Sequence, residues 1–145
     1  MIVNERQYAI TKAELRRFEQ AAADQRRRGP SEGVDSRLGE VMVDALLSQA
    51  ETLRGELGRY EDLREGRISE RELEDLRDLP TALIEARIAA GLTQRTLGER
   101  LGVGEQQVER WEGSLYAGVR VKRLWDVADA IGAEVRGTAR YAVRS

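Results

Sequence analysis

Residues 80–132 show the clearest alternation of apolar and polar positions, because apolar residues recur there every three or four residues between short breaks. This spacing predicts four helices, over residues 81–90, 94–101, 105–112 and about 120–131. The breaks contain Gly91, Gly102 and Gly132, and glycine readily takes the left-handed conformation that ends a helix. Thr93 is a suitable N-cap for the second helix. The predicted inward positions of the first and last helices are Leu83, Ile84, Ile88, Leu124, Val127, Ala128 and Ile131.

The second and third of these helices share one apolar set across Gly102, and Gly104 stands at the cap of the third helix. Gly98 lies where the two helices cross, so their backbones can approach closely. This is the pattern of a helix-turn-helix, a unit that lays its second helix in the major groove of DNA. The shared apolar set, which we expect to be structural, consists of Leu97, Leu101, Val103, Val108 and Trp111.

A much longer helical pattern precedes this part and runs from about residue 35 to 65. About 30 residues make a rod of about 45 Å, with an apolar seam close to 3.5 residues per turn. A shorter helix, predicted over residues 11–24 from a capping box of Thr11 and Glu14, covers only part of that seam in a hairpin. We therefore expect the rod to self-associate in a dimer or to bind another protein. The seam consists of Leu38, Met42, Leu46, Leu53, Leu57 and Tyr60.

Weaker patterns complete a mainly α fold. The alternation over residues 7–11 predicts a short strand with Tyr8 and Ile10 on one face. Residues 26–31, which include three arginines, are predicted to be a linker. A capping box of Ser69 and Glu72 predicts a short helix before Pro80. After Gly132 the period becomes two, which predicts a short strand near the C-terminal end of the given sequence with a basic outer face. Its partner would be residues 8–10, in the same chain or across a dimer. We thus expect an N-terminal helical region, 1–79, and a DNA-binding region, 80–145.

The amino-acid composition excludes several kinds of chemical site. The sequence contains no cysteine and no histidine, which excludes disulfides, Cys/His zinc sites and thiol or imidazole catalysis. We expect no catalytic residues, no metal and no cofactor. No apolar run approaches the ~18 residues of a membrane span, and the first residues lack the order of a signal peptide, so a soluble cytoplasmic protein is expected. Residues 1–80 carry a net charge of −4 and residues 81–145 a net charge of +2, so the predicted DNA-binding half is the basic one.

The third helix of the C-terminal part has a polar outer face suited to base recognition, because glutamine and arginine pair with adenine and guanine, and glutamate accepts from cytosine. The predicted base contacts are Glu105, Gln106, Gln107, Glu109 and Arg110. One of the two glutamates could orient Arg110 instead. Phosphate contacts should come from the start of the second helix and from the residues after the third. These are Gln94, Arg95, Ser114, Tyr116, Arg120 and Lys122. Alternatively, the basic residues at 120–123 are only a solvated helix face.

The stretch from Leu92-Thr93-Gln94 to Trp111-Glu112 resembles the Xre/Cro–repressor class of helix-turn-helix regulators. The lead Asn4-Glu5-Arg6-Gln7-Tyr8-Ala9-Ile10-Thr11-Lys12, with the long leucine-rich helix behind it, is similar to Xre-type antitoxins of the HigA kind. The first resemblance implies sequence-specific DNA binding and repression. The second implies autorepression of an operon and capture of a small toxin by the N-terminal region.

The favoured reading is a dimeric repressor that binds double-stranded DNA as an inverted repeat, with half-sites about 34–36 Å apart. Two alternatives stay open: a stand-alone or phage-type regulator without a toxin, and a protein–protein adaptor with a vestigial helix-turn-helix. An enzyme is not expected, because no glycine-rich phosphate loop lies between a strand and a helix.

Overall fold

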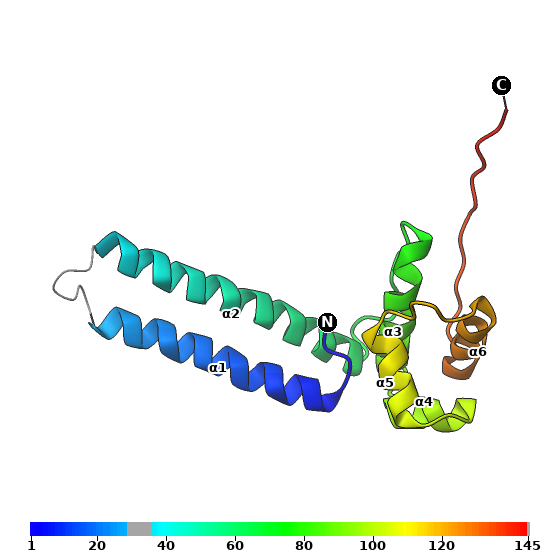
Figure 1. Cartoon of the computed structure of the whole chain (residues 1–145), viewed down its shortest axis with the longest axis horizontal. Coiled ribbons are helices and arrows are strands. Elements are labelled where there is room, and N and C mark those ends of the chain that lie inside the picture. The colour runs from blue at the N-terminus through cyan, green and yellow to red at the C-terminus, as the bar shows by residue number, and fades with distance from the viewer. Residues whose placement is uncertain (29–35, 145) are drawn as a thin grey trace. The chain divides into compact units, whose positions relative to one another are not determined.

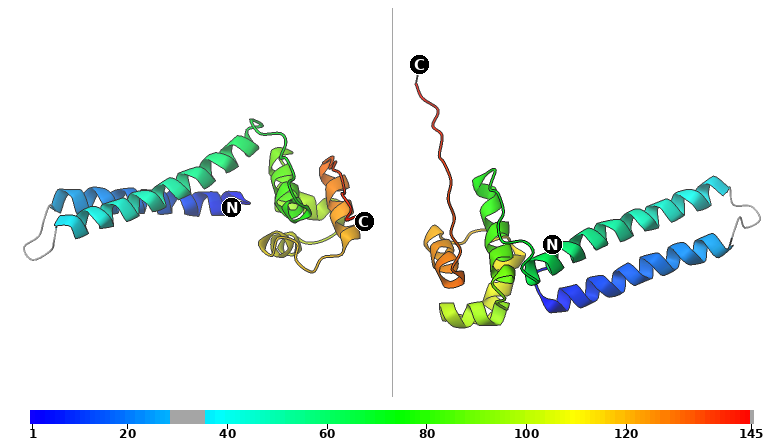
Figure 2. Two further views of the ribbon diagram at one scale, coloured as in Figure 1. Left: turned by 90° about the horizontal axis from the view of Figure 1, so that it is seen from above. Right: turned by 180° about the vertical axis from the view of Figure 1, so that it is seen from behind.

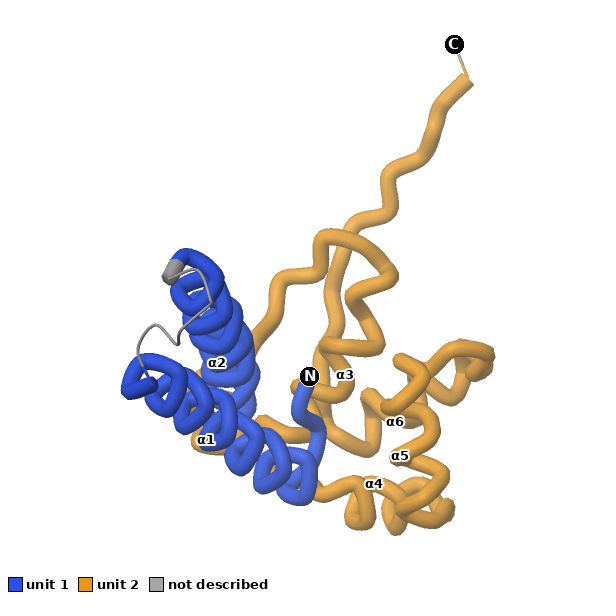
Figure 3. Tube along the Cα trace, turned by 60° about the vertical axis from the view of Figure 1, so that its left-hand side comes forward, with its two compact units in different colours: residues 1–62 blue, residues 63–145 orange. Residues whose placement is uncertain are grey.

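The computed structural model describes residues 1–28 and 36–144, and the regular structure within them is entirely helical. The chain divides into two compact units, Met1–Asp62 and Leu63–Ser145 (Figure 3). This division, between residues 62 and 63, comes earlier in the chain than the predicted boundary between residues 79 and 80. The helices are α1 (Glu5–Arg28), α2 (Ser36–Arg64), the 3₁₀-helix η1 (Leu76–Asp78), α3 (Leu79–Ala89), α4 (Gln94–Leu101), α5 (Glu105–Gly113) and α6 (Val121–Ile131).

In the first unit, α1 and α2 lie side by side and antiparallel (Figures 1 and 2). Since α1 has 24 residues, it follows most of the 29-residue α2. The first helix is therefore longer than the predicted 11–24, although it still leaves Leu38 and Met42 of the seam exposed. The helix itself was expected to begin at Thr11, but it begins at Glu5.

The buried side of this hairpin differs from the predicted seam in its first half. Leu38 and Met42 are 53% and 46% exposed, whereas Val43 and Ala50 are buried. In the second half Leu57 and Tyr60 are buried as predicted, and Leu46 and Leu53 are half-buried. The pattern favoured large residues, but the most deeply buried positions of the two helices are small ones, Ala22 of α1 and Ala50 of α2.

Polar contacts join the two helices along their length. The Tyr8 hydroxyl donates to Glu61 at 2.6 Å, and the Tyr60 hydroxyl donates to Glu5 at 3.1 Å. The two tyrosine rings lie 5.4 Å apart. Further along, Arg54 pairs with Glu19 at 2.9 Å, and its bonds to Glu19 and Glu51 raise the pKa of its guanidinium.

The predicted strand over residues 7–11 was wrong, because these residues belong to the first turns of α1. The Asn4 side chain accepts from the Gln7 backbone N–H at 2.8 Å. The Gln7 side chain in turn accepts from the Val3 N–H at 3.0 Å. These two bonds satisfy backbone donors that a helix start leaves open, so the chain becomes helical where the alternation of Tyr8 and Ile10 suggested a strand.

The segment before α3, which belongs to the second unit, was also predicted incorrectly. The capping box lies at Asp75 and Asp78 rather than at Ser69 and Glu72, and it starts η1, which runs directly into α3. Pro80 occupies the first turn of α3, where its missing N–H costs little. Of the predicted linker 26–31, residues 26–28 form the last turn of α1, and residues 29–31 lie outside the described part of the chain.

The helices α3 to α6 follow the sequence closely. Thr93 caps α4 through its hydroxyl, and Gly91, Gly102 and Gly132 all have positive φ angles at the ends of α3, α4 and α6. The predicted C-terminal strand is not present. Residues 133–144 are extended but form no ladder with any other described segment, and their proposed partner, residues 8–10, is helical. A strand needs an adjacent edge, and alternation alone does not provide one.

Candidate nucleic-acid interface

The joint between α4 and α5 fixes the angle of α5. Gly102 has a φ of 71°, and the Val103 N–H bonds to the Gly98 carbonyl at 2.8 Å. A Cβ atom at Gly98 would lie 2.7 Å from the Val103 carbonyl oxygen, so this position has no room for a side chain unless the backbone moves. This confirms the expected close approach and shows that the glycine sets how tightly α5 follows the turn.

A small apolar core holds α5 from behind. Leu97 of α4, Val108 of α5 and Val127 of α6 are fully buried, together with Leu83 and Ile84 of α3. Leu101, Val103 and Trp111 are half-buried, and the Arg123 guanidinium lies 5.1 Å from the Trp111 ring centroid. The predicted apolar set is thus structural, and it leaves one face of α5 outside.

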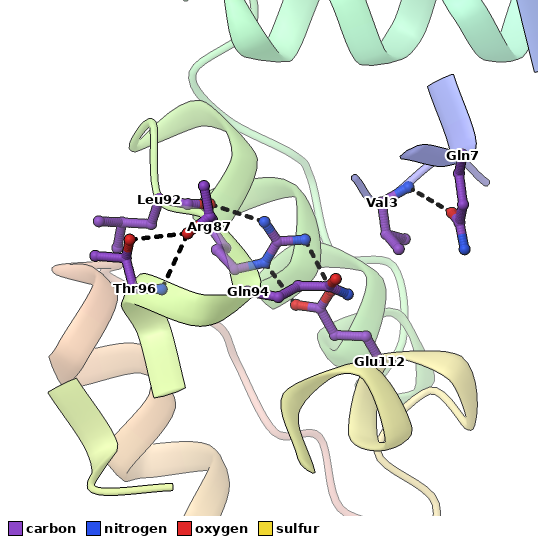
Figure 4. Close-up of polar contacts among 8 residues, drawn as sticks. Val3, Gln7, Arg87, Leu92, Gln94, Thr96 and Glu112 are labelled. Atoms are coloured by element: carbon purple, nitrogen blue, oxygen red, sulfur yellow. Dashed lines mark hydrogen bonds and ion pairs between the residues drawn. The ribbon is translucent and has the colours of Figure 1, made fainter. Parts of the chain in front are cut away.

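A buried ion pair locks α5 to α3. The Arg87 guanidinium donates to both oxygens of Glu112, at 2.6 and 2.7 Å, and the side chains are 3% and 0% exposed (Figure 4). The Gln94 amide donates to Glu112 at 2.9 Å, and Arg87 also donates to the Leu92 carbonyl at 2.8 Å. Such a two-pronged contact between buried charges defines one geometry, because any shift leaves a charge unpaired in an apolar interior.

Sequence reasoning missed this network, although a signal was present. Arg87 follows Leu83 by four residues, and Glu112 follows Val108 by four, so both charges fall at inward helical positions. Two opposite charges on the buried sides of neighbouring helices predict an internal pair.

The outward face of α5 carries the predicted base-contacting residues together. Glu105, Gln106, Glu109 and Arg110 are exposed and Gln107 is half-buried, as befits its position at the edge. Within the described residues, Arg110 forms no ion pair with either glutamate. The N-cap residue, Gly104, has no side chain to cap the helix, so the first backbone N–H groups of α5 face outward without a side-chain partner.

The predicted phosphate contacts divide into two groups. Arg95, Ser114, Arg120 and Lys122 are exposed around the ends of α4, α5 and α6. Arg95 and Lys122 make only surface pairs, with Glu99 and Asp126, each at 3.4 Å. Such pairs are weak and can be exchanged for contacts to phosphate.

Gln94 and Tyr116, by contrast, are each 4% exposed. Gln94 supports Glu112, as described above. Tyr116 stacks on Trp111 at 6.3 Å between ring centroids, and its hydroxyl finds no hydrogen-bond partner among the described residues. Burial raises the pKa of this hydroxyl, and the nearby Glu112 carboxylate adds to the rise. In this conformation both side chains support α5 from inside. A phosphate at Gln94 would then be bound by the backbone N–H groups at the N-terminus of α4 rather than by the side chain.

None of the described helices is long and apolar enough to cross a membrane. In the same part of the chain, no cluster of three or more acidic side chains is arranged to hold a metal ion.

Comparison with known proteins agrees with this geometry. Residues 83–136 match the family model described as helix-turn-helix. No curated protein and no solved structure matches the chain. The matched family binds DNA and is not an enzymatic one. The match covers α4 and α5 with the helices packed on them, and it therefore supports a DNA-binding transcription regulator of the Xre kind.

Proposed function

We propose that this protein is a sequence-specific transcriptional repressor that reads operator DNA with the outer face of α5. The supporting observation is the contrast between the two sides of this helix. One side is fixed by Val108 and by the Arg87–Glu112 pair, and the other presents glutamine and arginine side chains to solvent. A rigid helix with exposed bidentate donors and acceptors is what reading of base edges in the major groove requires.

The repressor would act as a dimer on an inverted repeat. The nine residues of α5 span only about 14 Å and contact few base pairs, so one copy gives little specificity. Two copies related by a two-fold axis would place their α5 helices in successive major grooves, about 34–36 Å apart. Leu38 and Met42, which the hairpin leaves exposed, belong to the seam that we expected to join two copies.

Footprinting on the DNA upstream of the protein's own gene tests this proposal. We expect protection of two half-sites related by a dyad, lost in Arg110→Ala and kept in Arg16→Ala, which removes an exposed arginine from α1. Protection that ignores sequence, or that is unchanged in Arg110→Ala, would overturn the role of α5.

We further propose that the hairpin binds a small toxin, so that the repressor is an antitoxin that controls its own operon. Two features support this. The segment from Asn4 to Lys12 is similar to the lead of Xre-type antitoxins, and Leu38, Val41 and Met42 form an exposed apolar group on α2. Exposed apolar groups of this kind are typical of protein interaction sites.

Co-expression tests the antitoxin proposal. A small adjacent gene should arrest growth when expressed alone, and the full-length protein should relieve the arrest. Leu38→Asp with Met42→Asp should abolish relief, whereas Arg110→Ala should abolish DNA binding and keep relief. If no adjacent gene arrests growth, the protein is a stand-alone regulator. If the full-length protein relieves the arrest but binds no DNA, it is a protein–protein adaptor with a vestigial helix-turn-helix.

A further inference from the structure

The residues that follow α6 carry a regular row of positive charge that the fold does not use. We call residues 133–144 the basic arm; it leaves α6 as a single extended segment (Figure 1). Arg136, Arg140 and Arg144 recur every fourth residue, so in an extended chain they point to one side at intervals of about 13 Å. Arg136 pairs with Glu134, and neither Arg140 nor Arg144 forms an ion pair within the described residues.

This row determines the net charge of residues 81–145. Residues 81–132, which hold α4, α5 and α6, contain seven basic and seven acidic side chains, so their net charge is zero. The basic arm adds three arginines and one glutamate, and thereby supplies the whole net charge of +2 of residues 81–145. Meanwhile Glu105 and Glu109 place negative charge on the outer face of α5. DNA affinity depends largely on neutralising phosphates, and the helical part alone is poorly equipped for that.

We propose that the basic arm binds the phosphate backbone of the DNA that α5 reads. This inference rests on the proposed function and adds to it the source of non-specific affinity. The arm is long enough: twelve extended residues span about 40 Å, while α6, which separates the arm from Arg120 and Lys122, is about 16 Å long. Its length is therefore sufficient to reach the flank where those phosphate contacts are predicted.

The alternation of the arm also allows a second occupant, the same segment of another copy paired as a β-ribbon. The apolar side is weak for this purpose, because its centre consists of Gly137 and Ala139. Its larger residues, Tyr141 and Val143, are 83% and 87% exposed. A two-stranded ribbon with little apolar surface is marginal in water. The complementary charges of the arginine row and DNA favour the nucleic acid.

Three full-length variants separate these possibilities. Arg136→Gln, Arg140→Gln and Arg144→Gln together remove the row. Arg6→Gln, Arg16→Gln and Arg17→Gln remove the same charge from exposed positions of α1, as a matched control. Val135→Thr, Tyr141→Thr and Val143→Thr remove the apolar side of the arm. Affinity for the footprinted duplex and for an unrelated duplex is measured by fluorescence anisotropy at several salt concentrations, and oligomeric state by sedimentation velocity.

We expect the arm variant to bind both duplexes more weakly, with affinity lowered by the order of 10²-fold at 0.1 M salt. The slope of log affinity against log salt should become shallower by about 2 to 3, at ~0.9 for each lost phosphate contact. The control and the apolar-side variant should match the wild type. An unchanged slope in the arm variant would overturn the inference, as would a dimer lost only in the apolar-side variant. If the wild type itself binds no DNA, the proposed function fails first.

Discussion

The two units of this chain use different interactions to hold their helices. In the helix-turn-helix unit, α4 and α5 meet at a glycine, pack on fully buried leucine and valine, and are fixed by a buried ion pair. In the α1–α2 hairpin, two alanines, Val43, Leu57 and Tyr60 are buried, and exposed or half-buried polar pairs join the helices. The first arrangement tolerates little movement, because each contact depends on one geometry. The second relies on contacts that water can replace.

This difference corresponds to the functions proposed for the units. Reading base edges requires side chains held to within a fraction of an ångström, so α5 needs a rigid support. A surface that binds a protein partner needs an exposed apolar group more than a fixed core. The two tryptophans, Trp111 and Trp125, both lie in the second unit, so tryptophan fluorescence follows that unit alone while far-UV circular dichroism follows both. Urea titrations that use both probes therefore separate the stability of one unit from that of the other.

The largest effect should come from the buried ion pair. Glu112→Ala leaves the Arg87 guanidinium and the Gln94 amide in the interior without their acceptor, which should cost about 3–5 kcal/mol of unfolding free energy. The matched change in the hairpin, Glu19→Ala, removes an exposed partner of Arg54 and should leave the unfolding curve unchanged within error. Equal losses in the two variants would mean that the contrast between the units is wrong.

Two glycine substitutions should change stability in opposite directions. Gly98→Ala places a Cβ 2.7 Å from a backbone oxygen and should destabilise the second unit by about 1–3 kcal/mol. Gly55→Ala, in the middle of α2, meets nothing within 4 Å and should stabilise the hairpin by about 0.5–1 kcal/mol through helix propensity. The tryptophan transition should shift only in Gly98→Ala. A stabilising Gly98→Ala would show that the α4–α5 joint has room to relax.

A smaller loss is expected at the polar contacts of the hairpin. Tyr8→Phe removes the donor of the 2.6 Å bond to Glu61 and should cost the hairpin about 1–2 kcal/mol, since the acceptor is a carboxylate but is only partly buried. The circular dichroism transition should move to lower urea while the tryptophan transition stays in place. If the circular dichroism and tryptophan transitions move together, the two units unfold as one, and their contacts do not give them separate stabilities.

The smallest effect should be a gain. The Tyr116 hydroxyl is buried without a partner among the described residues, so Tyr116→Phe should leave the second unit equally stable or stabilise it by up to about 1 kcal/mol at pH 7. Burial raises the pKa of Tyr116 above its usual value near 10. The contribution of its hydroxyl to the free energy of unfolding is therefore constant below about pH 10 and is lost as the pH rises further. The advantage of Tyr116→Phe should therefore grow above pH 10. An advantage that does not depend on pH would contradict the raised pKa.

Local signals made the second unit predictable from sequence. Thr93, Gly102 and Gly132 each act through contacts within a few residues of the helix end, so their effect can be read from the chain itself. The outer face of α5 follows from the same period once Val108 is placed inside. What escaped prediction depends on partners distant in sequence, such as the pairing of Arg87 with Glu112, 25 residues away.

The same distinction explains the errors in the first unit and after α6. Large residues such as Leu38 and Met42 suggested the seam, but which side of α2 is buried depends on how α1 packs against it, and the buried side includes Ala50. Residues 135–143 alternate as a strand does, yet pairing needs an edge elsewhere, and no other described segment provides one. Asn4 and Gln7, in contrast, were a local signal that the interpretation overlooked.

The claim that α5 reads DNA sequence is tested most directly by selecting bound duplexes from a random library with the wild-type protein and with Gln106→Ala. We expect the wild type to select an inverted repeat with half-sites about one helical turn apart. Gln106→Ala should select the same repeat with one position in each half-site relaxed, at a cost of about 1–3 kcal/mol for that base pair. Selection of no defined sequence by the wild type, or of an identical sequence by the variant, would contradict the claim that α5 reads DNA sequence.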